Sequence, residues 1–414
     1  MSRKMKDSGI TYLGMIPKSW NIFRIKNGFE CKKQIVGEKW NNTQLLSLTT
    51  NGVKEKNVDN PNGKLPESFE TYQLVNKNNI VMCLFDLDCS AVFSGISNYN
   101  GMISPAYKIL NCKESINPRF AGYFFNYIGY DRKYTHYSKN IRYTLSYEEF
   151  SFLPMIFPPV EEQIKISDYL DNKCAIIDEQ IENNKESIEL LEVYKKCLIQ
   201  NKLEKYGANK IKIKYLLAEG KEGIKCGPFG SSLTGKTLDS SNYKIYSQAN
   251  LISNNFEIFR NCVSKETYEN LSNYIVLPND ILLSMMGTIG KCKIIPTNIS
   301  PGIMDSHIIK VRLNNKIIPD FFELIYDKDT SNYIFEQLLY ESKGSIMDGL
   351  NTHIVKNLFF PYFSLAEQRK FVKEVKKQFI LINKVIDYRK QIIEKLEEYK
   401  KSLIYETVTG KIEV

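Results

Sequence analysis

Residues 162–199, EQIKISDYLDNKCAIIDEQIENNKESIELLEVYKKCLI, decide the fold because the chain contains a second copy of them. The second copy is residues 367–404, EQRKFVKEVKKQFILINKVIDYRKQIIEKLEEYKKSLI, which aligns without a gap at an offset of 205. Identical pairs include Glu162/Glu367 and Gln163/Gln368, and both copies contain the triplet Tyr-Lys-Lys. A match this dense indicates an internal repeat, and therefore two copies of one structural unit.

Each copy carries apolar residues at heptad spacing, which is typical of a helix that packs along another helix. The predicted seam residues are Ile177, Ile181, Ile188, Leu191 and Leu198 in the first copy, and Ile382, Ile386, Ile393, Leu396 and Leu403 in the second. Polar residues interrupt both seams at equivalent places, at Asn184/Arg389 and at Lys195/Lys400. Two separate amphipathic helices on globular cores are the alternative, but the shared register favours two long helices packed on each other. We expect them to form an antiparallel coiled coil.

Weaker similarity continues into the segments that precede each helix. KNNIVMCL resembles PNDILLSM, and INPRFAGYF resembles IPDFFELIY, while short apolar runs between Gly, Pro and Asn predict strands. The predicted fold class is α+β, with two mixed domains in tandem repeat and a long helix after each. The predicted boundaries are 1–156 for the first domain, 157–207 for the first helix, 208–358 for the second domain, and 359–414 for the second helix and C-terminal tail.

Composition limits the classes of protein to be considered. A chain of 414 residues with 43% hydrophobic residues predicts two or three domains with sizeable cores. It has no apolar run approaching the roughly 18 residues that span a bilayer, and no signal peptide is visible, so we expect a cytoplasmic protein without membrane contact. Nine dispersed cysteines without a CxxC motif predict free thiols, and three distant histidines predict no metal site. The net charge of +9 favours a polyanionic partner.

Residues 230–237, GSSLTGKT, match the P-loop pattern that binds nucleotide phosphates. A working P-loop follows a buried strand and opens a helix at its Lys-Thr. Upstream, EGKEGIKCGPF is charged and glycine-rich, and downstream, LDSSNYKIYSQ predicts a turn and then a strand. We therefore interpret this stretch as a loop, although a P-loop NTPase with a coiled-coil arm stays an alternative function.

Residues 117–120, Asn-Pro-Arg-Phe, are the string nearest to the NPPF-type loop of an amino methyltransferase, but Arg119 replaces the second proline. The repeat places Ile-Pro-Asp-Phe, residues 318–321, at the equivalent position. We interpret both strings as helix starts, with proline in the first turn.

Several stretches resemble motifs of Type I restriction-modification specificity subunits. FPPVEEQIKISDYLD resembles the PPxxEQ entry to their repeated helices, and CGPFGSSL and LPNDILLSMMGTIGK look like motifs of their target recognition domains. The opening MKDSGITYLGMIPKSWNIFRIK and the closing IYETVTGKIEV also resemble that family, so the resemblance covers nearly the whole chain. The second helix departs from the pattern, with FPYF where Pro-Pro is usual.

The resemblance implies two target recognition domains, each reading one half of a bipartite double-stranded DNA sequence. The paired helices would serve as a spacer and as the docking surface for two methyltransferase subunits. It also implies that this chain is not an enzyme, that S-adenosylmethionine and ATP bind to partner subunits, and that restriction or translocase subunits are further partners. A scaffold whose two domains bind proteins is the remaining alternative.

Candidate DNA-binding residues lie in basic and polar loops of both domains. RKYTHYSKNIRYT, residues 132–144, offers cations for phosphates, while GPFGSSLTGK, SQAN and ESKGSIMDGLNTH offer polar side chains and glycines. The set is Arg132, Lys133, Lys139, Arg142, Tyr143, Ser231, Ser232, Lys236, Gln248, Asn250, Lys343, Asn351 and His353. For each of them the alternative is a structural role, as a core tyrosine, a solvated cation or a polar residue at the end of a strand.

Overall fold

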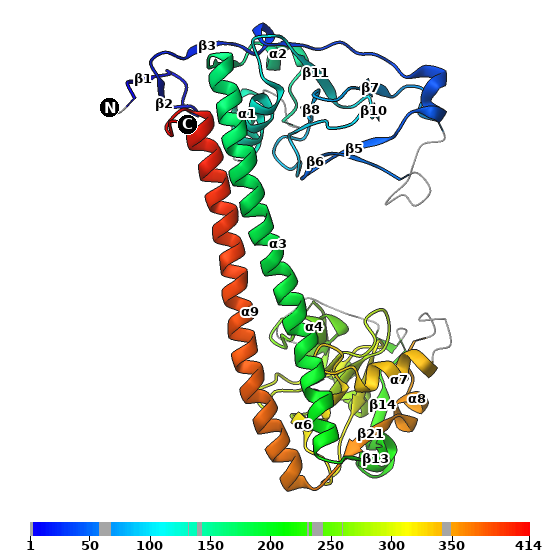
Figure 1. Ribbon diagram of the computed structural model, residues 1–414. Helices are drawn as coiled ribbons and strands as arrows, with labels where there is room; N and C mark the ends of the chain where they lie inside the picture. Colours follow the sequence, from blue (N-terminus) through cyan, green and yellow to red (C-terminus); the bar gives the residue numbers. More distant parts are fainter. Residues whose placement is uncertain are drawn as a thin grey trace. The chain divides into compact units, whose positions relative to one another are not determined.

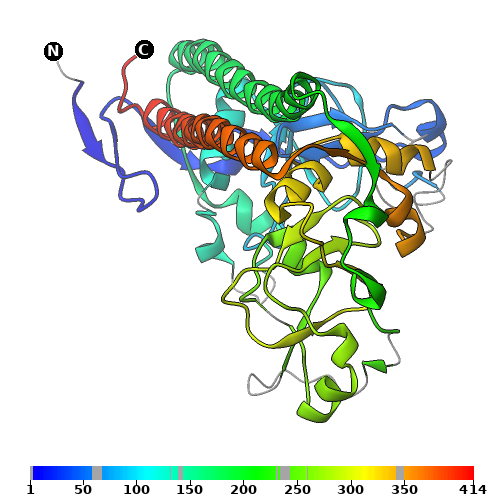
Figure 2. The same ribbon diagram turned by 90° about the horizontal axis from the view of Figure 1, so that it is seen from below.

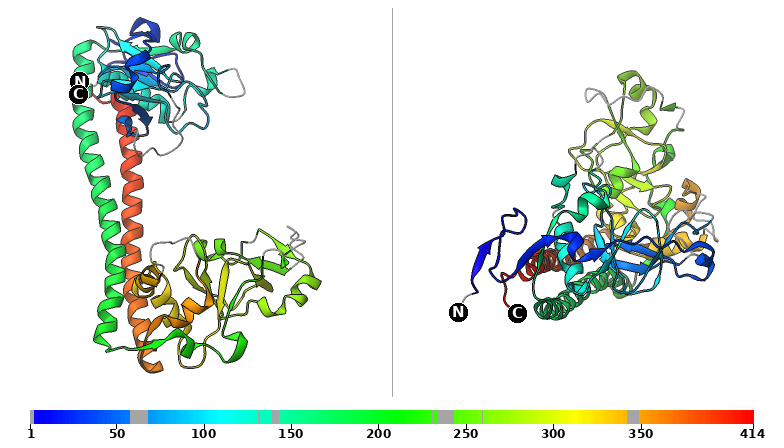
Figure 3. Two further views of the ribbon diagram at one scale, coloured as in Figure 1. Left: turned by 90° about the vertical axis from the view of Figure 1, so that its right-hand side faces the viewer. Right: turned by 90° about the horizontal axis from the view of Figure 1, so that it is seen from above.

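The computed structural model describes residues 3–57, 68–130, 132–138, 143–229, 232–233, 243–258, 260–341 and 349–414. The chain forms two compact units. Unit 1 is Met1–Asn183 with Gln391–Val414, and unit 2 is Asn184–Lys390. Each unit therefore holds one mixed α/β domain and a segment of each long helix, as can be followed in Figure 3. The four domain boundaries given above stay a prediction.

The elements of the two units are as follows. The strands of unit 1 are β1 (Met5–Asp7), β2 (Met15–Pro17), β3 (Asn21–Arg24), β4 (Phe29–Glu30), β5 (Leu46–Thr49), β6 (Gly52–Glu55), β7 (Gln73–Val75), β8 (Ile80–Met82), β9 (Ser94–Ile96), β10 (Gly101–Ile103), β11 (Lys108–Cys112) and β12 (Pro154–Phe157). Its domain helices are α1 (Pro118–Tyr130) and α2 (Tyr147–Ser151). The strands of unit 2 are β13 (Asn209–Lys212), β14 (Ile224–Cys226), β15 (Tyr243–Tyr246), β16 (Cys262–Val263), β17 (Ile281–Ser284), β18 (Cys292–Ile294), β19 (Gly302–Met304), β20 (Ile308–Val311) and β21 (Phe359–Tyr362). Its domain helices are α4 (Gln248–Ser253), α5 (Lys265–Asn270), α6 (Pro319–Tyr326), α7 (Tyr333–Glu341) and α8 (Thr352–Asn357), and the long helices are α3 (Val160–Lys205) and α9 (Leu365–Val408).

Both units contain a four-stranded antiparallel sheet with the same order of strands. The order is β4-β11-β8-β9 in unit 1 and β14-β20-β17-β18 in unit 2 (Figure 1). All residues of β8 and β17 are buried, which explains why both sequences are continuous apolar runs. A separate pair of strands, β3–β12 or β13–β21, leads into each long helix. The sequence repeat is therefore also a repeat of topology, and the predicted α+β fold class is confirmed.

The units differ in the additional strands that lie between the first and last strands of the sheet in chain order. Unit 1 places the hairpin β5–β6 and the pair β7–β10 there. Unit 2 has a three-stranded sheet instead, in which β15 pairs antiparallel with β16 and parallel with β19. The common frame thus carries different insertions in the two halves of the chain.

Within each unit the segments of α3 and α9 lie side by side and antiparallel (Figure 2). In unit 2 the Arg389 guanidinium donates to Asn184 Oδ1 at 3.0 Å, and Lys202 Nζ lies 2.8 Å from the Glu374 carboxylate. The residue number falls along α9 as it rises along α3, so the predicted antiparallel coiled coil is confirmed. Asn184 and Arg389 are equivalent positions of the repeat, and they bond to one another.

The ten seam residues predicted from the heptads all belong to, or pack against, the two main hydrophobic cores. Ile177, Ile181 and Leu403 are buried in unit 1, and Ile382 and Ile386 are buried in unit 2, while the other five are half-buried. One detail differs near the C-terminal end of α3. There Ile199 is fully buried and Leu198 is only half-buried, because the helix now faces the domain core as well as α9.

A buried glutamine joins α3 to the domain of unit 1. Gln163 Oε1 accepts the backbone N–H of Asn117 at 2.8 Å, and its Nε2 donates to the carbonyls of Ser115 and Pro158 at 2.9 and 2.8 Å. Asn117 is the residue before α1, which begins at Pro118 as predicted. The side chain of Gln163 is completely buried, so both of its N–H groups and its carbonyl are satisfied by backbone.

Gln368 makes the same three hydrogen bonds at the start of α9. Its Oε1 accepts the N–H of Ile318 at 2.9 Å, and its Nε2 donates to the carbonyls of Lys316 and Phe363 at 3.1 and 2.9 Å. Ile318 precedes α6, which begins at Pro319 as predicted. The glutamine of the repeated Glu-Gln pair therefore fixes the domain to the helix in both units.

The two long helices begin differently, which accounts for the departure of the second copy from the Pro-Pro pattern. In α3 the carbonyl of Pro159 accepts the first turn's N–H groups, including that of Gln163 at 3.0 Å. In α9 Ser364 and Glu367 form a reciprocal cap, with the Ser364 N–H donating to the Glu367 carboxylate at 3.0 Å and the Glu367 N–H to Ser364 Oγ at 3.4 Å. Serine capping thus takes the place of the second proline.

The ion pairs beside the two glutamines have opposite polarity. In unit 1 Arg119 of α1 pairs with Asp168 and Asp171 of α3, at 2.8 and 2.6 Å. In unit 2 Asp320, the equivalent of Arg119, pairs with Lys376, the equivalent of Asp171. All of these side chains are partly exposed, so each pair contributes at most about 1 kcal/mol. The reversal nevertheless means that each domain matches the charge of its own helix only.

Replacing Gln163 with alanine should loosen the attachment of α1 to α3. The change removes the partner of one N–H group and of two carbonyls, of which the Pro158 bond is buried and the other two are partly buried, and we expect it to cost about 3 kcal/mol. Hydrogen exchange measured residue by residue should show faster exchange in α1 and in the first turns of α3, with unit 2 unchanged. Gln368→Ala should have the mirror effect on α6 and α9. Lys165→Ala, an exposed change in the same turn as Gln163, is the control, and equal protection in Gln163→Ala and Lys165→Ala would contradict the assignment.

Candidate nucleic-acid interface

Equivalent loops come together in the two units. In unit 1 the loop after β8 is joined to the segment before α2 by the hydrogen bond from the Leu145 N–H to the Leu84 carbonyl, at 2.8 Å. In unit 2 the Leu350 N–H donates to the Met285 carbonyl, also at 2.8 Å. Leu145 and Leu350 are 205 residues apart, so the repeat extends to the loops where most of the candidate DNA-binding residues lie.

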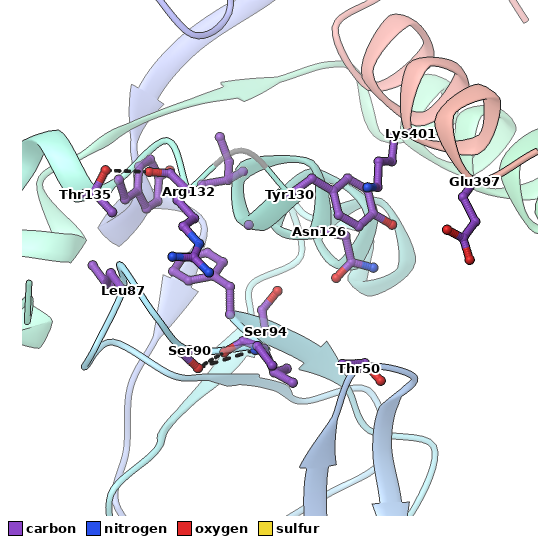
Figure 4. Close-up of a pocket in the computed structure, with 16 residues that line it drawn as sticks. Thr50, Leu87, Ser90, Ser94, Asn126, Tyr130, Arg132, Thr135, Glu397 and Lys401 are labelled. Carbon is purple, nitrogen blue, oxygen red and sulfur yellow. Dashed lines mark hydrogen bonds between the residues drawn. The ribbon is translucent and has the colours of Figure 1, made fainter. Parts of the chain in front are cut away.

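The loops of unit 1 border a cavity of about 510 Å³. Its walls come from the loop after β8, the strand β9, the last turn of α1 with the segment that follows, the turn between β5 and β6, and α9. Figure 4 shows the Arg132 side chain reaching from the segment after α1 toward the strand that carries Ser94. Tyr134 lines the same cavity, and burial raises the pKa of its phenol well above the usual range, so this phenol stays neutral.

The other candidates in unit 1 lie around this cavity or outside the described residues. Lys133 Nζ lies 4.8 Å from the centre of the Tyr127 ring, as a cation–π contact. Tyr143 is exposed, with a positive φ of 46°, and its carbonyl accepts the Leu87 N–H at 3.1 Å. Lys139 and Arg142 lie outside the described residues.

In unit 2 five segments meet in what we name the unit 2 loop cluster, residues 227–229, 247–250, 285–288, 305–307 and 349–353. Gln248 Nε2 donates to the Met286 carbonyl at 2.5 Å and to Thr288 Oγ1 at 2.9 Å, which ties α4 to the turn after β17. The Met285 N–H donates to the His307 carbonyl at 3.1 Å. The cluster therefore collects candidates as far apart in the sequence as Gln248 and His353.

Position 227 must be glycine because two backbone segments approach each other closely there. Its N–H donates to the Ile308 carbonyl at 2.8 Å, and a Cβ at this position would lie 1.9 Å from the Asp305 carbonyl oxygen. Glycines in a candidate binding loop predict close approach of a ligand to the backbone. At Gly227 the approaching group is instead the protein's own chain.

Asn250 has a structural role and offers no free group to a ligand. It is 4% exposed, its Oδ1 accepts the Ser247 N–H at 2.9 Å in the cap of α4, and its Nδ2 donates to the carbonyls of Asn255 and Ile258. The alternative of a structural role therefore describes Asn250, which lies in α4 and not at the end of a strand. Its neighbour Gln248 is half-buried, and the buried Oε1 of Gln248 has no partner among the described residues.

The last candidates of unit 2 lie at the edge of the cluster. Asn351 is exposed and caps α8, its Oδ1 accepting the Ile354 N–H at 3.0 Å. His353 is also exposed, and its Nε2 lies 3.2 Å from the Nδ2 of Asn357. Ser232 is exposed, and its N–H donates to the Phe229 carbonyl at 2.8 Å. Ser231, Lys236 and Lys343 lie outside the described residues.

The structure adds residues that the sequence did not single out. Phe229 is 86% exposed, which is unusual for an aromatic side chain, and Met286 is 44% exposed beside Gln248. Lys401 and Glu397 of α9 line the cavity of unit 1, although the sequence placed them on a helix and not at a site. The run MGTIGK contains two glycines with positive φ, Gly287 and Gly290, as expected for a tight turn after a strand.

The stretch that matches the P-loop pattern lies mostly outside the described residues. The next described element is the strand β15, where a P-loop would continue as a helix. Within the described part of the chain, no group of three or more His, Cys, Asp and Glu side chains is arranged to hold a metal ion. The described helices also include none with the length and apolar content needed to cross a bilayer.

Comparisons with known proteins connect this geometry to one family. The family model for the Type I restriction modification DNA specificity domain matches residues 223–398. A Methanocaldococcus jannaschii protein, provisionally named the type I restriction enzyme MjaX specificity subunit, is 21% identical over 427 residues, covering 98% of this chain and 96% of its own length. A solved structure from work on complex assembly and conformational transition of the type I R-M system has a TM-score of 0.69 at 12% identity, covering 96% of this chain and 99% of its own. This last likeness concerns the fold. Taken with the repeated helices and their Glu-Gln entry, these matches make the chain similar to Type I restriction-modification specificity subunits, through the family model over residues 223–398 and through the relative over nearly the whole chain.

Proposed function

We propose that this chain is the DNA sequence-recognition subunit of a Type I restriction-modification complex, and that each unit reads one half of a bipartite double-stranded site. The observation that carries this proposal is the equivalence of the two loop regions. The hydrogen bonds of Leu145 to Leu84 and of Leu350 to Met285 place loops of different sequence at the same point of the same frame. Two readers built alike, with different side chains, suit a target made of two different half-sites.

The chemistry of these loops is that of DNA contact. Arg132 in unit 1 can neutralise a phosphate, and the exposed side chains of Ser232, Asn351 and His353 in unit 2 can donate hydrogen bonds to phosphates or base edges. A net charge of +9 favours approach to DNA. Because the chain acts on DNA, we place it in the cytoplasm.

We infer that the helix pair docks partner subunits, because each unit exposes apolar side chains there. In unit 2 Tyr194 is 53% and Leu381 is 57% exposed, and in unit 1 Ile176 is 46% and Tyr399 is 56% exposed. These four residues form two equivalent pairs at the offset of 205, Ile176 with Leu381 and Tyr194 with Tyr399. Equivalent exposed surfaces in the two units fit two copies of one partner, and the methyltransferase subunit is the partner we propose.

The four residues also share one side of the helix pair within their units. Each directly precedes a seam residue, as Tyr194 precedes Lys195 and Leu381 precedes Ile382. In an antiparallel pair of right-handed helices, positions that precede the seam fall on the same side of both helices. Tyr194 and Leu381 therefore flank the seam together in unit 2, and Ile176 and Tyr399 do so in unit 1. We name these the two docking pairs.

We further propose that the chain carries no active site, so that S-adenosylmethionine and ATP bind to partner subunits, which include restriction or translocase subunits. The string nearest to a methyltransferase loop is used for folding. Asn117 Oδ1 accepts the N–H groups of Arg119 and Phe120 at 3.0 and 3.2 Å, and its own N–H is bound by Gln163. The side-chain oxygen of Asn117 is thus committed to the start of α1.

Exchanging residues 1–156 for the corresponding residues of another family member should change only one half of the methylated sequence. The loops of unit 1 would be replaced, while the frame and the loops of unit 2 stay the same. Adenine-methylome sequencing of cells that carry the exchanged gene measures this directly. Exchange of residues 208–358 is the matched experiment and should change the other half. A change in both halves, or in neither, from either exchange would refute the two-reader proposal.

Placing a carboxylate in each docking pair should remove one methyltransferase subunit at a time. Burying an unpaired charge in an apolar contact is costly, so Ile176→Asp and Leu381→Asp should each reduce the stoichiometry from two to one, and the double variant to none. Native mass spectrometry of the assembled complex measures the stoichiometry. Asn383→Asp, on the opposite flank of the same helix, is the control and should keep two subunits. Normal assembly of the double variant would show that the partners dock elsewhere.

A further inference from the structure

The cavity of unit 1 is unusual because a long helix forms part of its wall. Lys401 of α9 lines the cavity together with Arg132, and a residue of the second repeat copy thus meets the domain of the first. Figure 4 shows Arg132 on one side of the cavity, and Tyr130, Lys401 and Glu397 on the other. The cavity, at about 510 Å³, is much larger than a single anion requires.

Arg132 is held in place by its backbone. It has a positive φ of 49°, which a residue other than glycine rarely adopts. Its N–H donates to the Gly129 carbonyl at 3.1 Å, and its carbonyl accepts both the N–H and the Oγ1 of Thr135, at 3.0 and 2.8 Å. These three bonds fix the point from which the guanidinium extends. Among the described residues no carboxylate forms an ion pair with it.

Lys401 supplies the second cation. Its Nζ lies 5.8 Å from the centre of the Tyr130 ring, and no carboxylate of the described ranges lies within ion-pair distance of it. The adjacent Lys400, by contrast, is bound to Asp178 at 2.6 Å. Lys400, the seam lysine, therefore forms its ion pair within the helix pair, while Lys401 remains available to a ligand.

Ser94 is an independent sign of a ligand. It is only 6% exposed and lines the cavity, and its buried Oγ has no hydrogen-bond partner among the described residues. A buried hydroxyl without a partner costs free energy, which a bound acceptor would recover. Asn126 adds an amide to the same cavity.

The lining selects the class of ligand. Hydrogen-bond donors predominate in the lining of the cavity. Donors are offered by Arg132, Lys401, Ser94 and Asn126, and the lining contains a single carboxylate, that of Glu397. Phosphate oxygens accept from these side-chain types, and the apolar walls, which include Val92, Phe93 and Ile128, suit the sugar between two phosphates. We propose that this cavity binds a sugar–phosphate segment of the DNA backbone, with Arg132 and Lys401 as its phosphate ligands. The proposal rests on the DNA-reading function proposed above, and it makes α9 part of the DNA-binding surface of unit 1.

The salt dependence of DNA binding tests this assignment. Each phosphate contact contributes about 0.9 to the slope of log affinity against log salt concentration. Arg132→Ala and Lys401→Ala should therefore each lower the slope by about 0.9, and should weaken target and non-target duplexes alike. The binding measurement uses the full chain, in the complex in which it purifies. Arg132→Lys should retain the slope, and Lys77→Ala, an exposed cation of unit 1 that does not line the cavity, is the control.

The other outcomes separate failure of this inference from failure of the proposed function. A wild-type chain without sequence preference would refute the DNA-reading function itself. A sequence-specific wild type whose variants keep its slope would overturn the cavity assignment alone. Variants that change the preference for the target without changing the slope would show that the cavity reads bases. Binding of inorganic phosphate or a mononucleotide without DNA, lost in Arg132→Ala, would show that the source is a soluble phosphate, which also overturns the assignment.

Discussion

The three hydrogen bonds of a buried glutamine determine where each domain sits on its long helix. Gln163 and Gln368 occupy the first turn of α3 and α9, and each bonds the residue that precedes a proline-started helix, α1 or α6. Those short helices pack on the four-stranded sheets, and the loops that follow the sheet strands carry the candidate binding residues. A side chain in a helix thus sets the position of loops that it does not touch.

The frame is repeated, while the surface it carries is not. Both units have the same order of strands and the same loop-to-loop hydrogen bond, yet unit 1 has a cavity with an arginine and unit 2 has a cluster built on Gln248. A rigid frame keeps the energetic cost of changing a loop local. The exposed surface of the helix pair, unlike the loops, is alike in the two units. Equivalent apolar side chains are exposed there, at Ile176 and Leu381 and at Tyr194 and Tyr399. The loops can therefore differ between the units while the exposed surface of the helix pair stays alike.

Sequence reasoning predicted those features that depend on periodicity and local chemistry. The long helices, their antiparallel pairing and the helix starts at Pro118 and Pro319 follow from heptad spacing, from seam residues at matched positions and from proline in a first turn. Features that depend on distant contacts could not be predicted. The sequence does not show that the buried Asn250 amide donates hydrogen bonds to carbonyls five and eight residues away. It also does not show that Lys401 lines a cavity together with residues of α1. It also gives no sign that Gly227 is needed because another backbone segment passes within contact distance.

The reversed ion pairs at the two junctions give the chain a preferred order of its domains. A duplicated gene starts with identical junctions, so either domain could be placed before either helix. With Arg119 facing aspartates and Asp320 facing a lysine, a domain moved by recombination to the other position would meet a like charge. An exchange between the same positions of two related genes would keep the attraction. Each surface pair therefore stabilises a domain in its own position, by about 1 kcal/mol at most, relative to the same domain in the other position.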